Sequence, residues 1–216
     1  IMFYGLPTDV SDPEAARQLV DCDYLFLAAD SHQARAVFNA LVHQYLIPGV
    51  QIGSRVEVDP DSGVVGQIFS VVRPVTPDHG CMWCNGLISS AKLTDEATGS
   101  RAGGGHGYLN VDDAPAPAVM TLNALGVGQA VNDFMLSVTG LRLPGGTVGD
   151  YQRHEVRSGS RTSELPRRAG DCPDCSSAAH SVLARGDRAR LPVRAAGVSG
   201  IRRLRWDARR RVATGP

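Results

Sequence analysis

Residues 24–52 decide the fold, and they read YLFLAADSHQARAVFNALVHQYLIPGVQI. Their first six residues are apolar and too few for a helix, which predicts a strand that is buried on both faces. Between Ala34 and Tyr45 apolar residues follow the i, i+3, i+4, i+7 spacing of an amphipathic helix. Pro48 ends this helix, and a second strand begins at Val50. A strand, a helix and a strand in about thirty residues predict a βαβ unit, so the sheet is at least partly parallel.

The segments around this unit add a helix upstream and antiparallel strands downstream. The stretch 11–20, SDPEAARQLV, carries capping and first-turn residues typical of a helix start. Residues 55–58 and 65–72 flank the turn-forming sequence DPDSG, which predicts a hairpin. A further helix is expected over 116–139 and a last hairpin over 151–165. The predicted fold class is therefore α/β with a mixed sheet.

The composition is that of a globular protein, with 43% hydrophobic and 20% charged residues. No apolar run approaches the ~20 residues of a membrane span, and the N-terminus lacks the pattern of a secretory signal. We therefore expect a cytoplasmic protein without a membrane partner.

The zero net charge hides an asymmetry between the two ends of the chain. Residues 1–150 carry 16 acidic and 7 basic residues, whereas residues 151–216 carry 15 Arg and 6 acidic residues. Such a basic end can bind nucleic acid. Arg outnumbers Lys 21 to 1 in the whole chain, however, so a compositional bias is the better explanation. We expect residues 193–216 to be a solvated, disordered, arginine-rich tail.

Four of the five cysteines form two C-x-x-C pairs, Cys81 with Cys84 and Cys172 with Cys175. Two thiolates three residues apart can share one tetrahedral Zn²⁺, and a second pair completes a four-sulfur site. Such a closed site is structural, and it would hold the C-terminal segment against the core. The alternatives are a redox dithiol, which needs no second pair, and disulfides, which a chain without a leader disfavours. Cys22 stands alone and is expected to be a core residue.

The order of these features resembles the ThiF/MoeB/HesA family, the bacterial relatives of ubiquitin-activating enzymes. The shared features are a strand that ends in Asp, D-S-H-Q-A-R-x-x-x-N, a hairpin, C-M-W-C-N-G-L, a helix that ends in V-T-G-L, and C-P-D-C. The resemblance covers residues 20–175. It implies a Rossmann-like mixed sheet of the ThiF/MoeB type with a structural zinc site. It also implies ATP-dependent adenylation of a C-terminal carboxylate, usually the Gly-Gly end of a ubiquitin-like or sulfur-carrier protein, with release of pyrophosphate.

The resemblance also supplies candidate residues for ATP and its Mg²⁺. Asp30 matches the aspartate that acts at the Mg²⁺ and the triphosphate, and it follows a parallel strand, where open α/β sheets bind ligands. A helix cap is the alternative role for this residue. Arg35 and Asn39 match the arginine and asparagine of the motif, and the alternatives are a solvent-facing arginine and a polar helix position. Arg55 is a further candidate for the nucleotide or the modifier tail.

Two departures from the family pattern bear on activity. The glycine-rich phosphate loop has no counterpart, because Gly103–Gly107 follows no strand and Gly126–Gly128 lies in a helical pattern. Together with a first residue other than Met, this predicts that residues 1–192 are a partial adenylation domain, incomplete at its N-terminus, within a longer protein. Residues 85–171 contain no cysteine, so the chain resembles members that stop at the adenylate.

Three functions remain open at this stage. The first is the C-terminal part of an adenylyltransferase, active only with its nucleotide-loop half, for which the resemblance also implies a homodimer. The second is a non-catalytic, zinc-stabilised scaffold that lacks ATP chemistry, and the missing glycine loop separates it from the first. The third is a nucleic-acid binder, which would show steeply salt-dependent binding.

Overall fold

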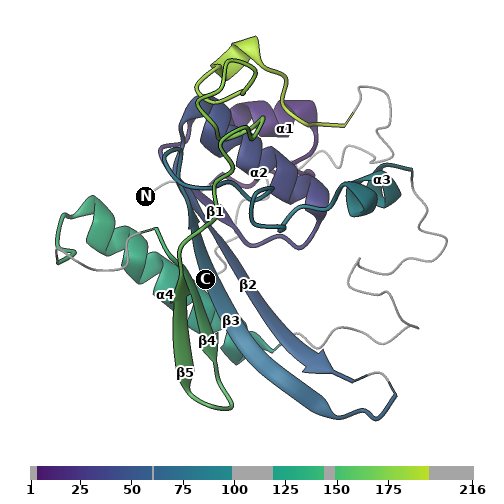
Figure 1. Cartoon of the computed structure of the whole chain (residues 1–216), viewed down its shortest axis with the longest axis vertical. Coiled ribbons are helices and arrows are strands. Elements are labelled where there is room, and N and C mark those ends of the chain that lie inside the picture. Colours follow the sequence, from purple (N-terminus) through teal and green to yellow (C-terminus); the bar gives the residue numbers. More distant parts are fainter. Residues whose placement is uncertain (1–3, 60, 99–118, 144–148, 195–216) are drawn as a thin grey trace, which may run out of the picture.

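The computed structural model describes residues 4–59, 61–98, 119–143 and 149–194 (Figure 1). These residues form one five-stranded sheet in the order β1-β2-β3-β4-β5. The strands are β1 (Leu25–Leu27), β2 (Gly49–Val58), β3 (Val65–Val75), β4 (Tyr151–Glu155) and β5 (Ser160–Glu164). β1 and β2 are parallel, and every later pair is antiparallel. The α/β class, the mixed sheet and both hairpins are confirmed.

The described residues form the three helices that the sequence predicts and one more, α3. They are α1 (Pro13–Gln18), α2 (His32–Tyr45), α3 (Ser90–Thr98) and α4 (Met120–Val138), with 3₁₀ turns η1 (Leu19–Asp21) and η2 (Gly186–Arg188). Asp12 caps α1 by accepting two backbone N–H groups of its first turn. Ser31, not Asp30, caps α2, because its hydroxyl accepts from the N–H of Ala34 at 3.1 Å. None of these helices has the length and apolar character that crossing a membrane requires.

Alternation along the strands gives the sheet two apolar faces with different covers. On one face, Leu25 and Val75 belong to a cluster with Val37 of α2. On the other face, Ile52 belongs to a smaller cluster with Ala130 of α4. In Figure 1, α1 and α2 lie at one end of the sheet, whereas α4 packs across β2 and β3. α2 therefore covers one face of the sheet and α4 covers the other. We call these the α2 face and the α4 face.

β1 differs from the expected strand that is buried on both sides. Leu25 and Leu27 are buried, but Phe26 is 45% exposed. Its ring lies on the α4 face, where the Phe134 ring contacts it at a centroid distance of 5.4 Å. Because β1 is an edge strand within the described sheet and α4 reaches it mainly through this aromatic contact, one side of β1 stays partly open.

The C-terminal segment, residues 166–194, returns over α2 after β5. The N–H of Ala184 donates to the carbonyl of His43 at 2.8 Å. Arg17 and Asp187 form an ion pair at 2.6 Å, which ties α1 to η2. Residues at both ends of the described chain therefore pack around α2.

Two predictions fall on residues that are not all described. Of the predicted tail, residues 195–216 lie outside the described residues, whereas Val193 packs against the core and Arg194 pairs with Asp9 at 2.8 Å. Gly103–Gly107 also lies outside the described residues. Gly126 lies within α4, as the helical pattern predicts.

Candidate functional site

The two C-x-x-C pairs meet in space, although 91 positions separate their members. All four Sγ atoms lie within 4.8 Å of one another, with 3.6 Å between Cys81 and Cys172 and 3.7 Å between Cys84 and Cys175. Metal–sulfur bonds of about 2.3 Å in a tetrahedron place the sulfurs about 3.8 Å apart. A disulfide needs about 2.05 Å, and every cysteine of the chain is free. The four thiols therefore fit one metal ion of the kind that tetrahedral sulfur ligands bind.

The chemistry of these thiols favours a bound cation. Backbone N–H groups point at the sulfurs: that of Cys84 lies 3.5 Å from the Sγ of Cys81, and that of Asp174 lies 3.4 Å from the Sγ of Cys172. Such donors stabilise negative charge on sulfur. Burial nevertheless raises the pKa of the Cys81 thiol, and it raises the pKa of Cys175 to about 11. Because a thiol releases its proton to solvent when its sulfur coordinates a metal, a bound cation would offset this cost.

Asn39 of α2 connects the two cysteine loops. Its side chain is fully buried, its Nδ2 donates to Asp174 at 2.6 Å, and its Oδ1 accepts from the N–H of Met82 at 2.8 Å. Both ends of the amide are therefore engaged by the loops that carry the sulfur ligands. A contact between Asn39 and a nucleotide stays a prediction of the resemblance.

Arg35, one turn before Asn39 on α2, also reaches the chain that follows the first cysteine pair. Its Nη1 donates to the carbonyl of Leu87 at 3.0 Å, while its Nε is buried without a partner among the described residues. The structure thus brings Arg35 and Asn39 together on the helix face that supports the metal centre.

The other two nucleotide candidates are exposed. Asp30 lies three residues after the end of β1, and its carboxylate makes no hydrogen bond or ion pair with any described residue. Arg55 lies on β2, with its Nε 3.8 Å from the Oε1 of Glu57. Asp30 is therefore free to bind a cation or a donor, but no contact joins it to Arg55. Nucleotide binding by either residue stays a prediction.

Sequence reasoning missed Glu96, which lies at the beginning of α2 although it belongs to α3. Its two carboxylate oxygens accept from the backbone N–H groups of His32 and Gln33 at 2.9 and 2.8 Å. These groups form the positive end of the helix, where a carboxylate is favourable. No local pattern could have indicated this contact, because more than 60 positions separate Glu96 from α2.

A half-buried arginine on the α2 face was missed as well. The Nη1 of Arg73 donates to the Oε1 of Gln51 at 2.7 Å, and its guanidinium lies 6.0 Å from the ring centre of Tyr151. Burial lowers the pKa of Arg73 and raises that of Tyr151, whose hydroxyl is buried without a partner in the described structure. The thiols of the metal centre add to the rise for Tyr151. This face therefore carries positive charge near the sulfur ligands.

Fold and site together define a class. No protein-family model matches the sequence, and no curated protein matches it. Solved structures do match, and they show that the chain shares their fold.

Among them are structures of E. coli MccB. The form with ATP is 14% identical, with a TM-score of 0.53 over 79% of this chain and 44% of that chain. The form with AMPCPP and MccA is also 14% identical, with a TM-score of 0.53 over 79% and 45%. The form with MccA-N7isoASN is 13% identical, with a TM-score of 0.55 over 80% and 46%. The chain thus spans less than half the length of these MccB chains, and identities this low establish the fold alone.

Proposed function

We propose that this chain is the metal-bearing part of an adenylyltransferase that activates the C-terminal carboxylate of a peptide or of a ubiquitin-like or sulfur-carrier protein. The observation that carries the proposal is the shared fold with MccB, whose structures contain ATP, and AMPCPP together with MccA. The free carboxylate of Asp30, just beyond a parallel strand, supports it, because open α/β sheets bind ligands at that edge.

The reaction would place one new bond and break another at the α-phosphorus of ATP. An oxygen of the substrate carboxylate attacks that phosphorus, and the bond to pyrophosphate breaks, which leaves an acyl-adenylate. Such a transfer depends on neutralising charge and aligning the reactants more than on acid–base help. In this scheme Asp30 would hold the Mg²⁺ that accompanies ATP, and Arg55 is the exposed cation on the neighbouring strand.

The metal centre has a structural part in this proposal. The four cysteines would hold Zn²⁺, which supplies folding free energy and leaves no open coordination position for chemistry. Asn39 holds the cysteine loops against α2 through its hydrogen bonds to Asp174 and Met82. Because α2 begins two residues after Asp30, a fixed helix also restrains the backbone at Asp30.

Calorimetry of Mg-ATP binding tests the proposal on the zinc-loaded chain. We expect saturable binding that Asp30→Asn weakens at least tenfold. Asp23→Asn is the matched control, because Asp23 is an exposed aspartate before β1. Equal binding by the wild type and Asp30→Asn would refute the role of Asp30. ATP–pyrophosphate exchange that depends on an added peptide carboxylate then tests the reaction itself.

The same experiment addresses a second candidate function, a non-catalytic scaffold stabilised by the metal. The observation that favours it is the lack of a glycine-rich strand-to-helix turn within the described residues, since Gly126 and Gly128 lie inside α4. A folded, zinc-loaded chain that binds no Mg-ATP would support the scaffold and contradict a self-sufficient nucleotide site.

A further inference from the structure

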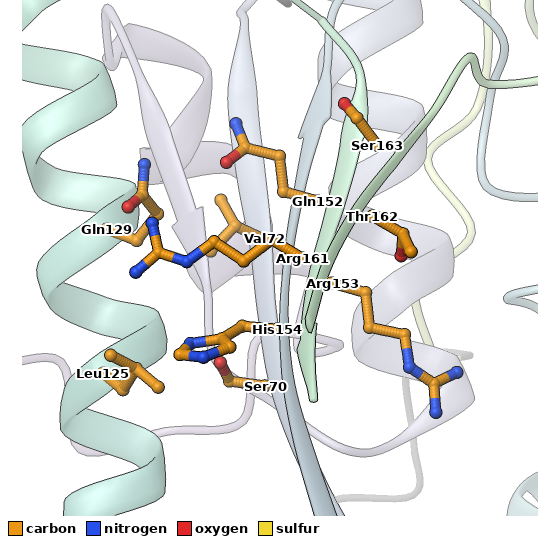
Figure 2. A pocket seen from close by; sticks show the side chains of 10 residues that line it. All are labelled: Ser70, Val72, Leu125, Gln129, Gln152, Arg153, His154, Arg161, Thr162 and Ser163. Carbon is orange, nitrogen blue, oxygen red and sulfur yellow. The ribbon is translucent and has the colours of Figure 1, made fainter. Parts of the chain in front are cut away.

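A pocket of about 210 Å³ lies on the α4 face, between α4 and the strands β3, β4 and β5 (Figure 2). Its polar wall is made by side chains from all four elements: Ser70, Gln129, Gln152, His154 and Arg161. Asp30 and the cysteine loops belong with α2, so this pocket is separate from the candidate site described above.

Three of these side chains form one row across the sheet. Ser70 of β3 lies opposite His154 of β4, and His154 lies opposite Arg161 of β5. Directly opposed residues project from the same face of a sheet, which brings the three side chains side by side. In Figure 2 the Arg161 guanidinium reaches toward Gln129 on α4, whereas Arg153 points away from the pocket.

The row consists of hydrogen-bond donors without protein partners. Within the described residues, Ser70, His154 and Arg161 make no side-chain hydrogen bond or ion pair. Ser70 is only 4% exposed, so its hydroxyl has little access to bulk water. Neighbouring Arg153 differs, because its guanidinium lies 3.6 Å from the ring centre of Phe69 and its Nη2 donates to Gln67.

Two acids lie beside the pocket. Gln129 and Gln152 donate their amide groups to Asp133 at 3.1 and 3.2 Å, and Arg142 forms an ion pair with it at 2.8 Å, so its charge is compensated. Asp150 accepts from the hydroxyl of the lining residue Ser163 at 3.1 Å. Among the lining side chains, Arg161 is the cation that shares a face with the free donors, and such a set suits an anion that accepts several hydrogen bonds.

We propose that this pocket binds a small oxyanion, a carboxylate or a phosphate, through Arg161, His154 and Ser70. The planar guanidinium of arginine matches both groups because it can donate two parallel hydrogen bonds. Leu125 supplies an apolar wall, so the oxyanion belongs to a small organic molecule that packs its carbon part there. The site does not depend on the proposed adenylation.

NMR titration of the zinc-loaded chain tests this site with inorganic phosphate and with succinate, at constant ionic strength set by chloride. We expect saturable shifts of backbone amides in β3, β4, β5 and the facing turn of α4 for at least one probe. Binding by phosphate alone identifies a phosphate site, and binding by succinate alone identifies a carboxylate site. Absence of saturable shifts with both probes overturns the proposal.

Substitutions separate specific binding from general charge attraction. Arg161→Gln should weaken binding at least tenfold, and the fold should be kept because Arg161 has no partner in the described structure. Arg157→Gln removes the same charge from the β4–β5 turn, outside the pocket lining, and it should change binding less than twofold. Equal weakening by both variants, with unchanged thermal melting, would contradict a built site.

Discussion

The amide of Asn39 donates to the carboxylate of Asp174 at 2.6 Å, a contact that spans 135 positions of the sequence. The same side chain accepts from the backbone of Met82 at 2.8 Å. One buried residue of α2 therefore orders both loops of the sulfur centre. The centre and the helix depend on each other, and α2 begins beside Asp30.

Replacement of this residue should weaken both the fold and the metal site. Asn39→Ala leaves the N–H of Met82 and the carboxylate of Asp174 without their partner in a buried place, which costs about 2 kcal/mol of unfolding free energy. Urea unfolding measures the loss, and release of zinc to a chromogenic chelator should become faster. Asn132→Ala, on the exposed side of α4, is the control and should change neither. Full stability and unchanged zinc release in Asn39→Ala would contradict the bridging role.

A glycine before the first cysteine pair allows close packing of two chain segments. A Cβ at Gly80 would lie 1.8 Å from the carbonyl oxygen of Arg167, so Gly80→Ala must push the two segments apart. We expect a loss of about 2–3 kcal/mol in unfolding free energy, measured in urea. Gly170→Ala is the matched control, because its Cβ would meet nothing within 4 Å. Similar unfolding free energies of the two variants would show that the segments at Gly80 and Arg167 can move apart without loss of stability.

His43 should make the fold sensitive to acid. It is fully buried in α2, and neither ring nitrogen has a partner among the described residues. Burial lowers the pKa of His43 to about 4, and the Arg168 cation adds to this effect. The unfolded chain takes up this proton near pH 6.5, whereas the folded chain resists it until about pH 4. The contribution of His43 to the unfolding free energy is therefore at its full value above about pH 6.5. It falls by roughly 3 kcal/mol as the pH drops to 4.

Acid also protonates cysteine thiolates that hold a metal, so the measurement is a difference between two pH profiles. Guanidinium unfolding of the wild type and of His43→Met, a flexible apolar replacement, is compared from pH 7.5 to 4.5. The variant should lose less stability on acidification. His180→Gln, at an exposed histidine, should keep the wild-type slope. Parallel profiles for the wild type and His43→Met would rule out His43 as a source of acid sensitivity.

Removal of the metal should release the C-terminal segment from α2. We expect one zinc ion per chain. Chelation should raise the rate of hydrogen exchange at the N–H of Ala184, which donates to the carbonyl of His43 in the structure. Mass spectrometry of exchanged peptides reports this directly. Cys175→Ser should reproduce the effect without a chelator, and Cys22→Ser should not, because Cys22 lies outside the cluster. Unchanged hydrogen exchange at Ala184 after verified zinc loss would mean that the C-terminal segment stays packed on α2 without the metal.

Local patterns predicted much of the fold. The apolar spacing before Pro48 is confirmed as α2, the DPDSG turn joins β2 to β3, and the paired cysteines meet in one cluster. The helix and the turn depend on residues that are close in the sequence. The cysteine cluster follows from two C-x-x-C pairs, a spacing typical of a four-sulfur metal site. The chain also shares its fold with the MccB structures, at 14% identity.

Other features depend on partners far away in the sequence. Phe26 reads as a buried strand residue, but its exposure depends on how far α4 extends over β1. Asn39 reads as a polar helix position, and only the folded chain shows the two cysteine loops around it. No sequence pattern around Glu96 indicated its contact with α2, because that contact requires α3 to lie against the beginning of α2.

The 91 positions between Cys81 and Cys172 have a consequence for biosynthesis. At 5–20 residues per second, a ribosome needs roughly 5–18 s to proceed from the first cysteine pair to the second. During that interval the nascent chain exposes two thiols that cannot complete a four-sulfur site. Only a chain translated past Cys175 can close the site, so a metal that needs all four sulfurs would bind only after the second pair has been synthesised.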